Sequence, residues 1–359
     1  MHLPILDGHN DTLRRLYPYR DEDLQKFLVR GTEGHLDLPR AREGGLAGGL
    51  FAVFASAHAP GTHIPSQVIH TPEGFEQPLA EALDPAHALS MTIAITAGLF
   101  RLEAASGGQI KVARTVEEVA HCLETGVLAA VLHLEGADAI DPDLYLLDVL
   151  HRAGLRSLGI AWSRPNLFGC GVPFRFPHSP DTGPGLTEEG RALVRACNRL
   201  GILVDVSHLN EQGFWDLAAI TTAPIVATHS CVHALCPVTR NLTDRQLDAI
   251  RESDGIVGLN FEVSFLREDG TDNRDTPLSV AVRHIDYLVE RIGIDRVGFG
   301  SDFDGATMPL ELGDAVGVPK LIALLREAGY DEPSLRKLAY ENWLRVLELT
   351  WRAQGDTML

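Results

Sequence analysis

The sequence predicts an α/β fold, a single (β/α)8 TIM-type barrel that spans residues 1–359 as one domain. Three observations predict it. Short apolar runs and amphipathic segments follow one another along the whole chain, the runs rarely alternate with polar residues, and no linker or shift in composition divides the 359 residues. Strands that are buried on both faces have such runs, and repeated strand–helix units imply a parallel sheet. About eight units favour the closed barrel, with a doubly wound open sheet as the alternative.

The strand candidates are eight apolar runs, at residues 5–7, 49–55, 129–134, 157–161, 203–206, 225–228, 255–260 and 297–300. Helices are predicted where apolar residues recur at three- and four-residue spacing, at residues 86–105, 143–152, 188–200, 211–220, 244–252 and 278–292. Thr187 and Thr243 are the expected caps of two of them. Two further helices, residues 318–328 and 333–354, follow the last strand.

Two irregular segments interrupt the pattern, at residues 56–84 and 166–185. Both are rich in proline and glycine. Structureless loops of this length are uncommon unless they cover or bind a substrate. We therefore expect both segments to lie near the functional site.

Composition excludes several classes of partner. The chain has 49 acidic and 31 basic residues and a net charge of −18. Nucleic acids and anionic membranes recruit basic patches, so we expect neither as a partner. The five cysteines have no pairing pattern, and no signal peptide or uninterrupted apolar run of spanning length is evident. These features predict a cytoplasmic protein. The fifteen histidines are more than such a chain needs.

Potential metal ligands follow five of the predicted strands. These residues are His9 and Asp11, Glu135, His208, His229, and Asp302. Active sites of barrels are built at the carboxyl ends of the strands, where these side chains converge. Three imidazoles and three carboxylates exceed the needs of one tetrahedral zinc ion. They match two adjacent divalent ions that share a carboxylate and a bridging hydroxide.

Two further residues have less certain roles from the sequence. Arg240 follows the His229 segment, and it either binds a substrate carboxylate through two hydrogen bonds or forms a surface ion pair. His133 lies two residues before Glu135 and therefore on the same face of the strand, where it supports the ligands or packs. No phosphate-binding glycine motif and no serine-hydrolase elbow occurs, which leaves metal-activated water as the nucleophile.

Taken in order, several short motifs resemble the membrane (renal) dipeptidase family of binuclear zinc peptidases, in its bacterial form. They are Asp7-Gly8-His9-Asn10-Asp11-Thr12, Glu135-Gly136, Asp205-Val206-Ser207-His208, Thr228-His229-Ser230, Arg240-Asn241, Gly300-Ser301-Asp302-Phe303-Asp304-Gly305 and Asn342-Trp343-Leu344-Arg345-Val346. The resemblance implies an amidohydrolase-like barrel that binds two zinc ions per chain. It also implies hydrolysis of dipeptides, often with a D-residue at the C-terminal position.

The resemblance also implies roles for individual residues. His9 and Asp11 would bind one zinc ion, His208 and His229 would bind the other, and Glu135 would bridge them. Asp302 would contact the bridging water as general base and acid, and Arg240 would hold the C-terminal carboxylate of the substrate.

Two positions depart from the mammalian pattern. Trp162 replaces a histidine after the fourth strand, and Glu262 lies near the place of a tyrosine that fixes the substrate. Both are therefore candidate substrate-binding residues, and the substrate preference of mammalian relatives does not carry over.

The expected reaction is attack of a metal-bridging hydroxide on the peptide bond of a small dipeptide, with Asp302 and Glu135 as catalytic residues. A homodimer remains open. One alternative is a related amidohydrolase acting on N-acyl amino acids or cyclic amides. It is disfavoured because the first motif is His9-x-Asp11 rather than His-x-His, and because no lysine ends a central strand. The other alternative is a catalytically silent metal-binding scaffold, which would have lost Asp302 or Arg240.

Overall fold

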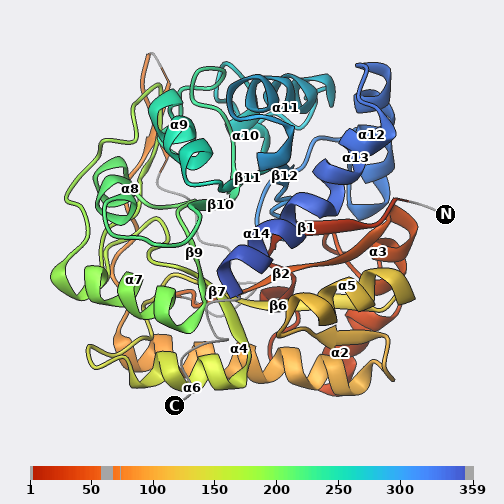
Figure 1. Cartoon of the computed structure of the whole chain (residues 1–359), viewed down its shortest axis with the longest axis horizontal. Coiled ribbons are helices and arrows are strands. Elements are labelled where there is room, and N and C mark those ends of the chain that lie inside the picture. Colours follow the sequence, from red (N-terminus) through yellow and green to blue (C-terminus); the bar gives the residue numbers. More distant parts are fainter. Residues whose placement is uncertain (1–2, 58–67, 73, 352–359) are drawn as a thin grey trace.

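A ring of eight strands forms the centre of the computed structural model, which describes residues 3–57, 68–72 and 74–351 (Figure 1). All neighbouring strands in the ring pair in parallel. Around the ring the strands are β1 (Ile5–Asn10), β2 (Leu46–Phe54), β6 (Leu128–Glu135), β7 (Leu155–Gly159), β9 (Leu203–Asp205), β10 (Val226–Ser230), β11 (Ile256–Leu259) and β12 (Val297–Phe299). Each of the eight predicted strands overlaps one of these.

The barrel closes just beyond the end of β12. The Asp302 amide donates to the His9 carbonyl at 3.0 Å, and the Asp11 amide donates to the Phe303 carbonyl at 2.8 Å. These bonds join the last strand to the first, so the barrel prediction is confirmed and the open-sheet alternative is wrong. The closure also places the segment after β12 beside the segment after β1, and both carry predicted site residues.

Helices surround the ring (Figure 1). Those predicted from periodicity are found within three residues at either end, as α4 (Pro85–Ala105), α6 (Tyr145–Ala153), α7 (Glu188–Leu200), α8 (Glu211–Ala218), α9 (Asp244–Glu252), α11 (Ser279–Ile292) and α12 (Val318–Glu327). The last predicted helix is divided into α13 (Glu332–Arg336), a π-helical turn (Lys337–Glu341) and α14 (Asn342–Trp351). Its expected residues 352–354 lie outside the described residues.

Several short elements were not predicted. They are α1 (Thr12–Arg15), α2 (Asp21–Leu28), α3 (Leu38–Gly44), β5 (Ile110–Val112), α5 (Val116–Thr125) and α10 (Val263–Leu266). For α5 a local signal existed, because Thr115 caps the helix by accepting a hydrogen bond from the Glu118 amide at 3.2 Å.

The two irregular segments meet in a small antiparallel sheet. It consists of β3 (Ile69–His70), β4 (Phe75–Gln77) and β8 (Phe174–Phe176), with β4 in the middle. Residues 58–67 and 73 of the first segment lie outside the described residues. Pairing between segments a hundred residues apart cannot be read from either segment alone.

The C-terminal helix α14 lies across the middle of the ring in Figure 1. Its Trp343 is fully buried and donates from Nε1 to the Phe299 carbonyl at 3.0 Å. Glycines on three strands make room for the indole, because a Cβ on Gly8, Gly258 or Gly298 would come within 3 Å of it. Trp343 therefore fills one end of the barrel, and the carboxyl ends of the strands remain for the site.

By length and composition alone, α4 is apolar enough to cross a membrane. In the structure it contacts β2 and β5, and it buries Ile95, Leu99 and Leu102. This is the packing of a core helix of the barrel.

Candidate active site

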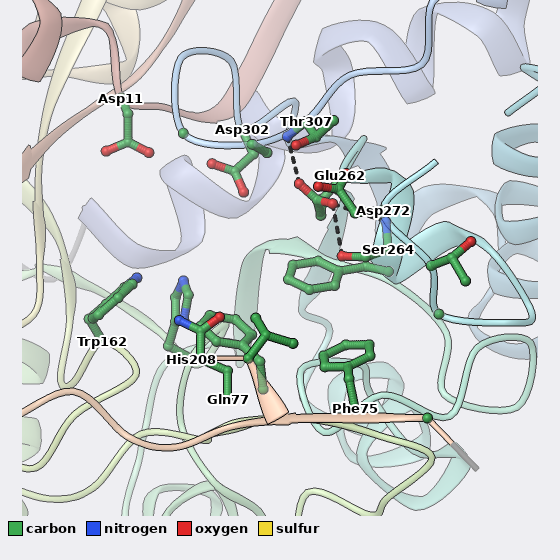
Figure 2. Close-up of a pocket in the computed structure, with 18 of the residues that line it drawn as sticks. Asp11, Phe75, Gln77, Trp162, His208, Glu262, Ser264, Asp272, Asp302 and Thr307 are labelled. Atoms are coloured by element: carbon green, nitrogen blue, oxygen red, sulfur yellow. Dashed lines mark hydrogen bonds between the residues drawn. The ribbon is translucent and has the colours of Figure 1, made fainter. Parts of the chain in front are cut away.

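A cavity of about 770 Å3 opens at the carboxyl ends of the strands (Figure 2). Its lining includes Asp11, Glu135, His208 and Asp302 from the barrel. The small antiparallel sheet contributes further walls, namely His70, Phe75, Gln77 and Phe174. The expectation that the two irregular segments lie near the functional site is therefore confirmed.

All six predicted strand-end residues meet at the base of this cavity. Three overlapping groups have ligand atoms within 4.8 Å of one another: His9 with Asp11 and Glu135, Glu135 with His208 and His229, and His9 with His229 and Asp302. Glu135 belongs to two of them, and its two oxygens point to different partners. Oε2 lies 3.7 Å from His9 Nε2, and Oε1 lies 3.2 Å from His208 Nε2. This is the arrangement expected of a carboxylate shared by two cations.

The chemistry of these side chains fits bound cations. Both ring nitrogens of His9 and Oδ1 of Asp11 are buried without a hydrogen-bond partner among the described residues. Burial and the negative charge of Asp11 raise the pKa of Glu135 to about 8. Buried polar atoms are rarely left unpaired, and buried like charges repel. Divalent cations would satisfy both the unpaired atoms and the clustered carboxylates.

Hydroxyl groups orient two of the histidines. Thr228 Oγ1 is 2.7 Å from His229 Nδ1, and Ser163 Oγ is 3.1 Å from His208 Nδ1. These contacts leave both Nε2 atoms facing the centre of the site, where they lie 3.2 Å apart. Burial, reinforced by nearby positive groups such as Arg240, holds the pKa of each histidine well below its usual value. Both rings are therefore neutral, the form that binds metal.

The buried carboxylate of Asp205 connects the ends of β9 and β10 through hydrogen bonds. Asp205 accepts hydrogen bonds from the Thr228 amide and hydroxyl and from the Ser207 amide and hydroxyl, at 2.6 to 3.0 Å. The Thr228 hydroxyl in turn contacts His229. Hydrogen-bonded partners of this kind fix the orientation of metal ligands. Sequence analysis included Asp205 in a motif but assigned it no role.

Asp302 occupies a left-handed backbone position, with φ of 60°. Its Oδ2 accepts a hydrogen bond from Asn260 Nδ2 at 2.9 Å, which leaves Oδ1 facing Asp11 across Gly305. Burial is the main reason that the pKa of Asp302 is raised. A half-buried carboxylate with one oxygen fixed and the other directed to the ligand cluster can exchange a proton there. Asn260 directly follows β11 and was not identified from the sequence, because nothing near it in the chain marks it as a partner of Asp302.

Two hydrogen bonds position the turn that carries Asp302. Asp304 also has a positive φ, of 68°, and it accepts a hydrogen bond from Thr12 Oγ1 at 2.8 Å and one from the His35 amide at 2.6 Å. The turn is thereby attached to α1 and to the segment before α3.

His133 lies beside the ligands and is fully buried. Its ring packs edge-on against that of His9, with 5.3 Å between centroids, and its Nδ1 is 2.8 Å from Ser157 Oγ. Burial and the neighbouring His9 lower its pKa to about 3. The packing role predicted for it agrees with this geometry, and His133 is in none of the three ligand groups.

Arg240 is 2 % exposed, so the alternative of a surface ion pair is wrong. Its Nη1 donates to Ser230 Oγ and its Nη2 donates to the His229 carbonyl, both at 2.9 Å, and the residue is not among those that line the cavity. The guanidinium therefore fixes the segment that carries His229 and Ser230. Its direct contact with a substrate carboxylate stays a prediction.

Both remaining predicted residues line the cavity, on opposite sides of it (Figure 2). Trp162 packs against the rings of Phe54 and His208, with centroids 5.0 and 5.9 Å away. Glu262 is held by the Ser264 amide at 3.0 Å and the Thr307 amide at 2.6 Å. Burial raises the pKa of Glu262 to about 7. Both positions are thus open to contact with a ligand.

The chain is similar to known proteins over nearly its whole length. The family model of membrane dipeptidases, peptidase family M19, matches residues 1–357. A crystal structure of a metallo peptidase from Rhodobacter sphaeroides, liganded with a phosphinate mimic of the dipeptide L-Ala-D-Ala, is 50 % identical. It superposes with a TM-score of 0.92 over 98 % of this chain and 100 % of that one.

Two relatives in sequence extend the comparison. An uncharacterized protein in the pqqA 5′ region of Klebsiella pneumoniae is 51 % identical over 75 % of this chain and 98 % of its own length. The dipeptidase tcpJ of Claviceps purpurea is 29 % identical over 95 % of this chain and 76 % of its own length. The expected resemblance is therefore confirmed over nearly the whole chain, and the protein belongs to the membrane dipeptidase family.

Proposed function

We propose that this metallo-dipeptidase uses two zinc ions to hydrolyse dipeptides with a D-residue at the C-terminal position. The observation that carries the two-ion part is the position of Glu135 between two groups of ligands. The substrate part is supported by the relative from Rhodobacter sphaeroides, whose ligand mimics L-Ala-D-Ala. Tetrahedral sites built from imidazole and carboxylate are typical of zinc.

The geometry of the site assigns the proposed ligands to two ions. His9 and Asp11 would hold one ion, His208 and His229 the other, and Glu135 would contribute one oxygen to each. When bound, such ions supply Lewis-acid activation of a water and of the scissile carbonyl. The hydroxyls of Thr228 and Ser163 keep the two Nε2 atoms in place during the reaction.

Asp302 is the group that moves the proton. Its Oδ1 would accept a proton from the attacking water and return it to the leaving amine. Asn260 holds the other oxygen, so the carboxylate keeps its direction through both transfers. General acid–base catalysis of this kind contributes roughly 100- to 10,000-fold to the rate.

Metal analysis combined with dipeptide assays tests the proposal. We expect about two zinc ions per chain, and higher kcat/KM for L-Ala-D-Ala than for L-Ala-L-Ala. Glu135→Gln should lose most of its activity and at least one ion. The exposed Glu252→Gln on α9 is the matched control and should change neither. Less than one zinc ion per chain, or full activity in Glu135→Gln, would refute the two-ion site.

A second variant tests the proton transfer. Asp302→Asn should lower kcat by at least 100-fold. If native protein and Asp302→Asn have equal, negligible rates on a dipeptide library, the chain is a silent metal-binding relative. A preference for neither stereochemistry together with turnover of N-acyl amino acids would favour the amidohydrolase alternative.

The predicted cytoplasmic location also stays a proposal. Its support is chemical, since all five cysteines are buried free thiols. Proteins with free thiols are typical of reducing compartments.

A further inference from the structure

Arg14 is the one arginine or lysine among the described residues that line the cavity. It lies in α1, one turn beyond the ligand Asp11, whose carbonyl accepts from the Arg14 amide at 3.0 Å. The side chain is half-buried, and no hydrogen bond or ion pair joins its guanidinium to another described residue. A guanidinium carries five N–H donors, so Arg14 is suited to hydrogen-bond a ligand in the cavity.

Aromatic packing defines where the Arg14 guanidinium lies. It is 5.7 Å from the centroid of the Phe54 ring, and Phe54 packs in turn on Trp162 with 5.0 Å between ring centroids. A guanidinium within about 6 Å of a ring centroid is attracted to the face of the ring, and this contact uses none of its N–H donors. Arg14 therefore belongs to the Trp162 side of the cavity.

Two other buried arginines, Arg164 beside Phe54 and Trp162 and Arg240 beside Phe265, already have hydrogen-bond partners. Arg164 pairs with Asp138 at 2.9 Å and donates to the Ala55 carbonyl at 2.6 Å. Arg240 donates to Ser230 and to the His229 carbonyl and does not line the cavity. Of these three guanidinium groups, only that of Arg14 lines the cavity and has no hydrogen-bond partner among the described residues.

The other charged residues of the cavity are acidic. Glu262 and Asp272 line the side away from Trp162 (Figure 2), and Asp11, Glu135 and Asp302 line it at the carboxyl ends of the strands. Among the described lining residues, Arg14 therefore supplies the one positively charged side chain that a substrate carboxylate could contact.

We propose that Arg14 binds a carboxylate of the dipeptide substrate on the Trp162 side of the cavity and is a specificity-determining residue. The carboxylate is either the C-terminal one or that of an acidic side chain, and both have the same chemistry. The inference rests on the proposed dipeptidase function. It adds a residue that sequence motifs do not reveal, because Arg14 is marked by its place in the cavity wall and by the lack of a partner among the described residues, and not by its neighbours in the chain.

The test compares substrates that differ only in one carboxylate. The variant is Arg14→Met, which keeps an unbranched apolar stem on Phe54, and Arg14→Lys keeps the charge without the planar fork. The exposed Arg101→Ala on α4 removes one positive charge far from the cavity and is the matched control. Three substrates are assayed: L-Ala-D-Ala, its C-terminal amide, and L-Ala-D-Asp. Zinc content and melting temperature are measured for each protein.

The readout is the ratio of kcat/KM between substrates. A charge-assisted hydrogen bond predicts that Arg14→Met loses about 10- to 100-fold of the preference for the carboxylate it binds. Loss of the acid-over-amide preference assigns the C-terminal carboxylate, whereas loss of the Asp-over-Ala preference assigns the side-chain carboxylate. Arg14→Lys should keep part of the preference, and Arg101→Ala should keep all of it.

Two results would overturn the inference. One is an unchanged ratio in Arg14→Met with native rates. The other is an equal loss on all three substrates, since a structural defect lowers every rate and leaves the ratios intact. Absence of dipeptide hydrolysis in the native protein would instead refute the proposed function, so the two failures are distinguishable.

Discussion

Replacing Gly305 by alanine should disable the site without unfolding the barrel. Gly305 follows the Asp302 turn, and its φ is one that alanine adopts without strain. An added Cβ would lie 3.0 Å from Cγ of Asp11, and nearer still to Oδ2 of Asp11 and Oδ1 of Asp302. Carboxylates at the ends of side chains can move aside, so the fold tolerates the methyl group. The predicted metal ligand and the predicted proton carrier cannot both keep their places.

The magnitude follows from the displacement. Ordinary van der Waals contact begins near 3.4 Å, so the two carboxylates must retreat by about 1 Å, and a misplacement of that size costs roughly 100-fold in rate. We expect kcat/KM on L-Ala-D-Ala to fall by about that factor. Zinc content should also fall, because Asp11 is one of the ligands, while the melting temperature of the zinc-free protein changes little.

Steady-state kinetics, metal analysis and thermal melting of Gly305→Ala provide the assay. Gly31→Ala is the matched control, since the nearest atom to its added Cβ is 3.9 Å away. Native kcat/KM and full zinc content in Gly305→Ala would refute the reasoning. Unfolding of the Gly305→Ala variant would also refute it, because it would show that the two carboxylates cannot move aside for the methyl group.

Three further predictions concern stability. Burial lowers the pKa of His284 to about 4, so its contribution to the free energy of unfolding is complete above pH 6.5 and is lost as the pH falls toward 4. This contribution amounts to about 3 kcal/mol. His284→Gln can keep the contacts to Val232 and Leu266, and in urea titrations its free energy of unfolding should depend less on pH over that range. Trp343→Ala should lower the free energy of unfolding by about 3 to 5 kcal/mol in the same titrations, and a loss below 1 kcal/mol would contradict its role in filling the barrel end. Chelation by EDTA should lower the melting temperature of the native protein and zinc should restore it, whereas Glu135→Gln should respond less; equal responses would argue against Glu135 as a ligand.

Much of the candidate site could be predicted from the sequence because its predicted metal ligands follow local patterns. His9, Glu135, His208 and His229 each end or follow a short apolar strand, and parallel strands in a barrel bring those ends together. Strand periodicity and residue type are both local properties. The eight strands and seven of the helices were predicted for the same reason.

Contacts between distant segments could not be predicted in this way. Asn260 holds Asp302, and Asp205 organises Thr228, yet nothing near Asn260 in the chain marks it as a partner of Asp302. The small sheet of β3, β4 and β8 was likewise hidden, because its strands are only two or three residues long. Such pairings depend on how the barrel folds the chain back on itself.

Arg14 and Arg240 show most clearly what the sequence decides and what the tertiary structure decides. By itself the sequence determined the fold class, the family and the six strand-end residues that the structure brings together, since these depend on periodicity, residue chemistry and the order of motifs. It pointed to Arg240 for the substrate carboxylate, and the structure places that guanidinium against Ser230 and the His229 carbonyl. Only the tertiary structure showed that Arg14 lines the cavity and that its guanidinium has no hydrogen-bond or ion-pair partner among the described residues. The physical reason is that the direction of a long side chain is set by its packing partners, here Phe54 forty residues away, and not by its neighbours in the chain.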